Sequence, residues 1–377
     1  MKKLLSIVAA LIAVVNSVQA QEDWKMVITH ADGQKTEIMT SDVKDIQYVK
    51  YIPVIADANV DQIIIKELYN GGCPKDDSGN FQQDKCIILY NNCSQRAVIN
   101  NLCIAFVTPY NGHGSNKNYT DDGKLTYEAE KFTPAFGGMW WYPYSLVIEP
   151  YSQVVINVCG AIDNTQTYSQ SVNYANADYY CMYDPESGFK IPSWYPTPAA
   201  EIPTSHYLKA KRLGTATSWP LSNSSPALFI FQTKDVEPSV FADNADNLWY
   251  DGGVVKDINA CLKVPNEWII DAIEVYQTSK ISDSKKRFTS DIDAGYVGLT
   301  NQLGHVLYRN VDKESTEALP ENAGKLVYNY ALGVDSSTDP SGIDAEASIK
   351  NGAHIIFNDT DNSTNDFHER QKCSLRN

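Results

Sequence analysis

The sequence is short of positive charge. Its 377 residues include 31 Lys and Arg against 46 Asp and Glu, which gives a formal net charge of -15. Nucleic acid and anionic lipid headgroups are bound through clustered Lys and Arg, so this balance argues against both as partners. The acidic surface indicates solubility rather than recognition.

Catalytic motifs are also missing. There is no Gly-x-Ser-x-Gly elbow, and the six histidines lack the His-x-His and His-Glu-x-x-His spacings that place two ligands on one face. We therefore predict no catalytic residue and favour a binding protein over an enzyme. A hydrolase stays open as an alternative, because a fold can bring a histidine beside a Ser or Cys nucleophile.

No apolar run beyond the N-terminus is long enough to cross a membrane as a helix. The N-terminal run follows two lysines and precedes a small-residue site at Ala20, which is the organisation of a secretory signal peptide. We expect residues 1–20 to be removed. Gln21 stands where a lipid-anchored protein would need cysteine, so we expect an exported, unanchored chain that is periplasmic, cell-surface or extracellular.

No two cysteines have Cys-x-x-Cys spacing, which disfavours redox and zinc-ribbon sites. An even number of cysteines in an exported protein nevertheless suggests disulfides, although the sequence cannot choose the connectivity. We expect local pairs among the first four cysteines to be the most favourable. The candidates are Cys73, Cys86, Cys93, Cys103, Cys159, Cys181, Cys261 and Cys373.

Short apolar and β-branched runs bounded by Gly, Asn and Pro dominate the rest of the chain, and no long helical period is present. Asp32-Gly33 between two β-prone runs predicts a hairpin in a small N-terminal module, residues 21–56. The many short strands of the main body, residues 57–377, favour an all-β sandwich. Strands are predicted over 62–68, 86–90, 102–107, 146–148, 154–158, 227–231, 268–275 and 354–357.

Segments 62–72, 84–92 and 101–105 resemble the opening of lamin-tail-like domains, in which a strand ending in an acidic residue leads to a second strand closing in Tyr-Asn. The main body as a whole resembles an uncharacterised family of exported Bacteroidetes proteins with this lamin-tail-like start, and segment 358–367 is its most specific match. The resemblance implies an immunoglobulin-like β-sandwich with long loop insertions. It also implies an envelope or secreted location, often beside outer-membrane receptor systems, and it carries over no catalytic residue.

An acidic segment near the C-terminus is a candidate calcium site. It presents oxygen side chains at alternate positions, as the first half of an EF-hand loop does, but Thr364 and Arg370 stand where that loop needs Gly and Glu. The alternative is a set of Asx-turns, in which these side chains bond their own backbone. The candidate ligands of Ca2+ are Asp359, Asp361, Ser363 and Asp366.

Aromatic residues are dense in segments that the sequence predicts as loops. Exposed Trp and Tyr rings stack on sugars or anchor protein partners, whereas the alternative is that they pack under the loops as satellite clusters. The candidate ligand contacts are Trp140, Trp141, Tyr142, Trp194 and Tyr195.

These observations favour a non-enzymatic, exported binding or interaction protein of the cell envelope, whose ligand is a protein or a glycan. Two alternatives remain at this stage. One is an envelope hydrolase acting on glycan or ester, and the other is a structural or assembly component associated with an outer-membrane receptor system.

Overall fold

The computed structural model describes residues 24–30, 33–44, 57–219 and 221–376. The predicted signal peptide lies outside these residues, as does residue 56 at the predicted boundary between the N-terminal module and the main body. The alternating pattern of residues 41–49 predicts a third short strand in the N-terminal module; most of it also lies outside the described residues, and Thr40–Asp42 is a 3-10 helix. The chain divides into two compact units, 1–51 and 52–377. Within the first, β1 (Lys25–Thr29) and β2 (Lys35–Met39) form the predicted antiparallel hairpin.

The second unit contains two six-stranded sheets, and its pattern confirms the all-β sandwich. The first sheet has the order β13-β12-β6-β3-β20-β21 and the second has the order β14-β10-β8-β15-β18-β19. The strands of the first sheet are β13 (Tyr180–Cys181), β12 (Gln153–Cys159), β6 (Lys85–Asn91), β3 (Ile63–Tyr69), β20 (Val306–Arg309) and β21 (Phe367–Arg370). Those of the second are β14 (Lys209–Arg212), β10 (Gly138–Trp141), β8 (Leu102–Phe106), β15 (Ala227–Gln232), β18 (Ile269–Gln277) and β19 (Val297–Leu299).

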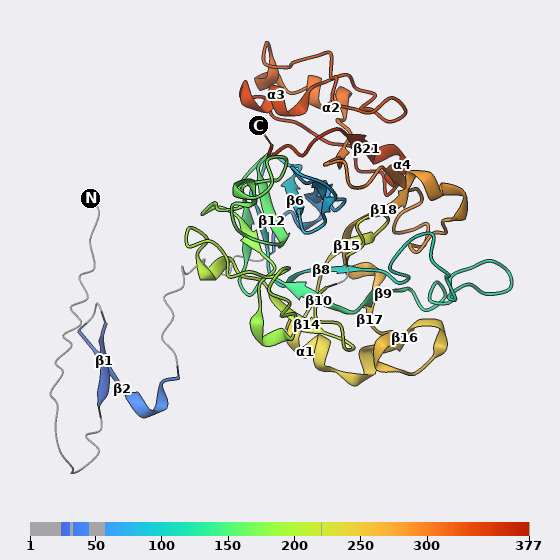
Figure 1. Cartoon of the computed structure of the whole chain (residues 1–377). Helices are drawn as coiled ribbons and strands as arrows, with labels where there is room; N and C mark the ends of the chain where they lie inside the picture. The colour runs from blue at the N-terminus through green and yellow to red at the C-terminus, as the bar shows by residue number, and fades with distance from the viewer. Residues whose placement is uncertain (1–23, 31–32, 45–56, 220, 377) are drawn as a thin grey trace. The chain divides into compact units, whose positions relative to one another are not determined.

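A third, smaller sheet covers the outer face of the second one. Figure 1 shows β8, β10 and β15 between β6 and β12 on one side and β9 and β17 on the other. The three strands of the smaller sheet are β16 (Leu248–Tyr250), β17 (Ala260–Pro265) and β9 (Phe132–Phe136). Two further strand pairs are β7 (Ala97–Ile99) with β11 (Leu146–Ile148) and β4 (Cys73–Pro74) with β5 (Asn80–Phe81).

Strand alternation divides the apolar residues between these layers, because neighbouring side chains on a strand point to opposite faces. The central core, between the two large sheets, contains Ile87 of β6 and Ile104 of β8. The second core, between the second and the smaller sheet, contains Phe229 of β15 and Leu262 of β17. Both faces of the second sheet are therefore buried.

The outer face of the first sheet is covered mainly by the C-terminal part of the chain, and around Cys86 also by Val172 and Tyr174. One apolar cluster there joins Tyr90 and Tyr308 to Ile355 and Phe357. The predicted strand at 354–357 is therefore wrong: Phe357 forms only an isolated bridge with Val311, because this run packs across the sheet rather than along its edge.

The described residues also form four short α-helices, namely α1 (Pro238–Asp243), α2 (Lys313–Glu317), α3 (Ala345–Lys350) and α4 (Ser363–Asp366). The part of the chain that the structure describes contains no helix of the length and apolarity that a bilayer crossing requires.

Candidate functional site

Trp140 and Trp141 lie next to each other on β10 but belong to different environments. Trp140 is 0% exposed in the central core, where its indole stacks on Phe189 with ring centroids 5.5 Å apart. Trp141 points to the opposite face, where it is half-buried against the second core. Strand geometry thus removes one indole from solvent and leaves part of the other accessible.

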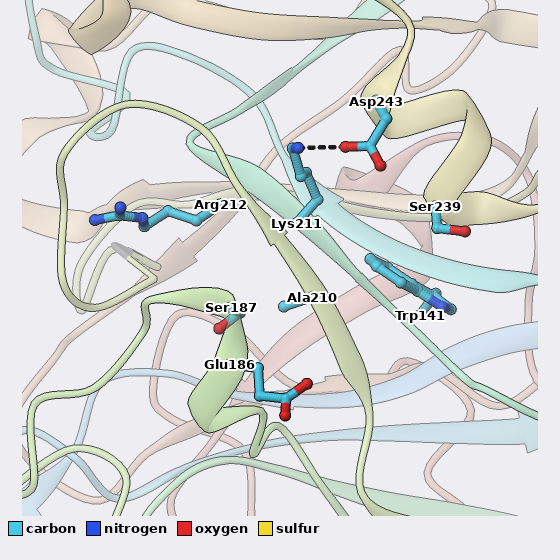
Figure 2. Close-up of a pocket in the computed structure, with 8 residues that line it drawn as sticks. All are labelled: Trp141, Glu186, Ser187, Ala210, Lys211, Arg212, Ser239 and Asp243. Atoms are coloured by element: carbon cyan, nitrogen blue, oxygen red, sulfur yellow. Dashed lines mark hydrogen bonds and ion pairs between the residues drawn. The ribbon is translucent and has the colours of Figure 1, made fainter. Parts of the chain in front are cut away.

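The accessible part of Trp141 lines a surface cleft of about 320 Å³. Figure 2 shows the cleft with Trp141 on one side, Glu186 and Ser187 on the opposite side, and the side chains of Lys211 and Asp243 at one end. The lining residues come from β10, β14, α1 and the short 3-10 helix Pro185–Ser187 (η4), and they are Trp141, Glu186, Ser187, Ala210, Lys211, Arg212, Ser239 and Asp243.

Pairing between β10 and β14 sets the position of Trp141. Trp141 lies opposite Lys209, and Gly138 lies opposite Arg212. Gly138 has φ 115°, and a Cβ at this position would overlap the Lys211 carbonyl oxygen. This close approach of the two strands therefore requires glycine.

Asp184 fastens η4 to β14. Its Oδ2 accepts a hydrogen bond of 3.0 Å from the Ala210 backbone N–H, and its Oδ1 lies 3.6 Å from the Lys209 ammonium. The carboxylate is buried, with only 6% of the residue exposed. Because this contact joins η4 to β14, it holds Glu186 and Ser187 across the cleft from Trp141.

The charges of the cleft are only partly neutralised. Lys211 pairs with Asp243 of α1, and the dashed line in Figure 2 marks this contact. Arg212 is turned away from Trp141 in the same view, and its Nη1 donates to the Ala216 carbonyl oxygen at 3.4 Å. Glu186 is exposed. An aromatic face beside hydroxyl, carboxylate and ammonium groups offers both stacking and hydrogen bonding to a polar ligand.

Three of the five predicted ligand contacts are core residues, and that part of the prediction is wrong. Trp140 is 0%, Tyr142 3% and Tyr195 8% exposed, all in the central core. The Tyr195 hydroxyl accepts a hydrogen bond of 2.8 Å from the Trp219 backbone N–H. The fourth, Trp194, is half-buried against the same core, with the Lys85 ammonium 5.4 Å from its ring centroid. Only Trp141 lines the cleft.

Three of the four predicted calcium ligands, Asp359, Ser363 and Asp366, bond groups of the protein. The Asp359 carboxylate lies 3.1 Å from Nη1 of the buried Arg309, and the Ser363 hydroxyl donates to Asp293 Oδ2 at 2.6 Å. Asp366 accepts hydrogen bonds from the Thr360 and Asn362 backbone N–H groups. Asp361 adopts a left-handed conformation with φ 52°. Across the described residues no group of three or more His, Cys, Asp and Glu side chains is arranged to hold a metal ion. Asp366 thus bonds nearby backbone, as the Asx-turn alternative expects, whereas Asp359 and Ser363 bond side chains from distant parts of the chain.

The eight cysteines, all within the described residues, carry free thiols in this structure. The first four are not gathered in one place. Cys103 belongs to the second core, whereas Cys86 lies on the outer face of the first sheet, in contact with the C-terminal segment. The expected local pairing therefore has no support from the arrangement of the strands.

The histidines are dispersed. His113 Nδ1 lies 3.4 Å from the hydroxyl of Ser225, but Ser225 is 0% exposed, so a substrate cannot reach that oxygen. His305 pairs with Glu369 at 2.6 Å, and His206 stacks on Tyr180.

The buried side chain of His368 is expected to make the stability of the fold decrease at acidic pH. Its ring nitrogens lie 2.8 Å from Asn310 Oδ1 and 2.7 Å from the Tyr330 hydroxyl, and burial together with the Arg370 charge lowers its pKa from 6.5 to about 3. The unfolded chain therefore binds the proton more readily than the folded one between these values. As the pH falls from about 6.5 towards 3, we expect protonation of this histidine in the unfolded chain to lower the free energy of unfolding by about 1.4 kcal/mol per pH unit.

Denaturant unfolding from pH 7 to pH 3 measures this slope. The free energy of unfolding of His368→Gln should fall less steeply with decreasing pH than that of the wild type. Both proteins contain the same carboxylates, so the contribution of these groups to the pH dependence cancels in the comparison. Parallel slopes in the two proteins would show that His368 does not remain neutral in the folded state.

Most residues that line the cleft could not be predicted from the sequence. Lys211, Asp243 and Glu186 lie in polar segments without a motif, and Lys211 approaches Trp141 only because β14 pairs with a strand about 70 residues earlier. The Lys209-Ala-Lys-Arg212 segment carries no apolar signal that would identify it as a strand. The density of aromatic residues was the only sequence signal for the cleft. Of the five residues that it indicated, only Trp141 lines the cleft.

Comparison with known proteins places the fold in context. The chain matches the model of a protein family of unknown function, DUF4876, over residues 149–374. Among solved structures it is similar to a DUF4876 family protein from Bacteroides thetaiotaomicron VPI-5482, with a TM-score of 0.57 and 17% identity over 81% of this chain and 70% of that one. At this identity the likeness shows the fold alone, and curated proteins gave no match. The family model covers more than half of the sequence, so the chain belongs to the DUF4876 family.

Proposed function

We propose that this chain is an exported, non-enzymatic binding protein of the cell envelope and that its ligand is a glycan held in the cleft beside Trp141. The observation that carries the proposal is the half-buried Trp141 indole, which faces a cleft whose other lining side chains, apart from Ala210, are polar. Sugars present an apolar ring face together with many hydroxyl groups, and such a surface complements both features.

The electrostatics of the cleft also suit a neutral or weakly charged sugar. The Lys211 ammonium is paired with Asp243, which leaves both groups able to hydrogen-bond hydroxyls without a net charge of their own. Ser187 and Ser239 add hydroxyl groups at the rim. The volume of about 320 Å³ lies at the lower end of small-ligand sites, which suits a terminal sugar rather than a long chain.

Binding without turnover is favoured over hydrolysis. The two carboxylates of the cleft, Glu186 and Asp243, are both exposed, and Asp243 is already paired with Lys211. Glycoside hydrolysis needs one carboxyl group kept protonated, usually by burial in an apolar pocket. Export rests on residues 1–20, whose pattern is that of a signal peptide.

An array of envelope and host-surface glycans tests the proposal. The wild-type protein should retain a defined set of glycans, and Trp141→Ala should bind the same set roughly 10- to 30-fold more weakly, since buried aromatic contacts contribute about 2 kcal/mol. Tyr144→Ala is the matched control, because Tyr144 is 40% exposed, near Trp141 in sequence and outside the cleft. Equal binding by wild type and Trp141→Ala would refute the site, and release of shortened glycans would indicate the hydrolase instead.

A further inference from the structure

Two cysteines that lie far apart in the sequence meet on the outer face of the first sheet. Cys86 belongs to β6 and lies opposite Tyr69 of β3 in the strand register. Cys373 follows β21 near the C-terminus. Both residues are 0% exposed and share one apolar cluster with Val155 and Tyr174. The two thiols are near enough that each contributes to the pKa shift of the other.

The backbone around Cys373 is held in place by contacts independent of the thiols. The Ser374 backbone N–H donates to Oε1 of the buried Glu67 at 3.0 Å, and Glu67 lies on β3, two residues before Tyr69. The Cys373 carbonyl oxygen accepts a hydrogen bond of 3.0 Å from the Arg376 N–H. In Figure 1 the C-terminal end of the described chain accordingly lies beside β12 and β6.

We propose that Cys86 and Cys373 form a disulfide as the exported chain folds, which rests on the export proposed above. One thiolate attacks the disulfide of an external oxidant, either a thiol–disulfide oxidoreductase or oxidised glutathione, and expels one of its sulfurs as a thiol. The second cysteine then attacks the mixed disulfide and expels the other sulfur. The two cysteines lose two electrons and two protons, and the oxidant becomes a dithiol or two thiols.

Burial determines when this reaction takes place. Desolvation raises the pKa of both thiols, and the thiolate is the reactive form. In the folded protein the pair is therefore nearly inert towards both oxidant and reductant. The bridge forms while the C-terminal segment is still open, and afterwards it is protected until that segment detaches from β6.

The bridge would fasten the last turn of the chain to a central strand. The C-terminal segment carries β21, whose Phe367 packs in the central core, and it pairs with β20 at the edge of the first sheet. A covalent link at Cys373 closes a loop containing most of the chain, which removes conformations from the unfolded state. The oxidised protein should therefore melt at a higher temperature than the reduced one.

Oxidative refolding tests the pairing without reference to the compartment. Reduced, denatured mature protein is refolded with oxidised glutathione, its remaining thiols are alkylated, and the product is mapped by mass spectrometry without reduction. We expect one cross-linked peptide joining Cys86 to Cys373 and a mass lower by about 2 Da than that of the reduced chain. The same oxidant added after reductive folding should give little bridge, because the thiols are then buried.

A matched pair of variants links the bridge to stability. The melting temperature should rise on oxidation in the wild type and in Cys103→Ser, whose thiol is buried in the second core, but not in Cys373→Ser. Free, alkylatable Cys86 and Cys373 after oxidative refolding would overturn the pairing. If the refolded protein bridges while protein from the natural host carries both thiols free, the export proposal fails and the pairing stands.

Discussion

Replacing Arg309 with methionine is expected to lower the free energy of unfolding by about 3–5 kcal/mol. Arg309 is 0% exposed at the end of β20, where it pairs with Asp271 of β18 and so joins the two large sheets. Its Nε donates to the Ile65 carbonyl oxygen at 2.8 Å, and its Nη1 donates to the Asn358 carbonyl oxygen at 2.8 Å. Methionine fills a similar volume but leaves the Asp271 carboxylate buried without its counter-charge.

Urea unfolding monitored by circular dichroism measures this loss. Lys313→Met is the matched control, because Lys313 is exposed and lies 4.0 Å from Glu317, so its change should stay within about 0.5 kcal/mol. Removing Asp271 as well, in Arg309→Met with Asp271→Leu, should recover part of the stability, since no buried charge then remains unpaired. A cost below about 1 kcal/mol for Arg309→Met would contradict the role assigned to this ion pair.

Trp140→Ala should be equally damaging, with a loss of about 3–5 kcal/mol. Its indole is 0% exposed and packs against Phe189 and Tyr195, with ring centroids 5.5 and 6.1 Å from its own. Alanine would leave a cavity between the two large sheets, and the β10–β14 pairing restrains the backbone from closing it.

Trp141→Ala provides the comparison within the same strand. Trp141 is only half-buried, so its replacement should lower stability by clearly less than that of Trp140 in the same urea titration. If both variants lost the same stability, Trp141 would be a packing residue like its neighbour, and the cleft would lose its proposed aromatic surface.

The sequence predicted the strands well where apolar runs were uninterrupted. The runs at 62–68, 86–90 and 154–158 became β3, β6 and β12, because strands buried on both faces need nearly continuous apolar residues. The segment around Trp140 is predicted as a loop, whereas the structure places Trp140 on β10, which begins at Gly138. The structure uses that glycine for a close strand contact instead.

The contacts of the acidic C-terminal segment could not be predicted from its sequence. Alternate oxygen side chains at Asp359, Asp361 and Ser363 match half of a cation-binding loop. The partners of Asp359 and Ser363, Arg309 and Asp293, lie 50 or more residues away and meet them only in the folded chain. The spacing of residues identifies side-chain oxygens that could bind a cation. It does not show whether an arginine or a hydroxyl group of the folded protein already bonds those oxygens.

Radical footprinting of the tryptophans tests the central claim, that the cleft beside Trp141 holds the ligand. The protein is oxidised by brief hydroxyl-radical exposure with and without a glycan retained on the array, and oxidation is read at each Trp by peptide mass spectrometry. Oxidation of Trp141 should fall several-fold with glycan present, while the half-buried Trp194, outside the cleft, should not change. Unchanged oxidation of Trp141 at a saturating glycan concentration would contradict the account.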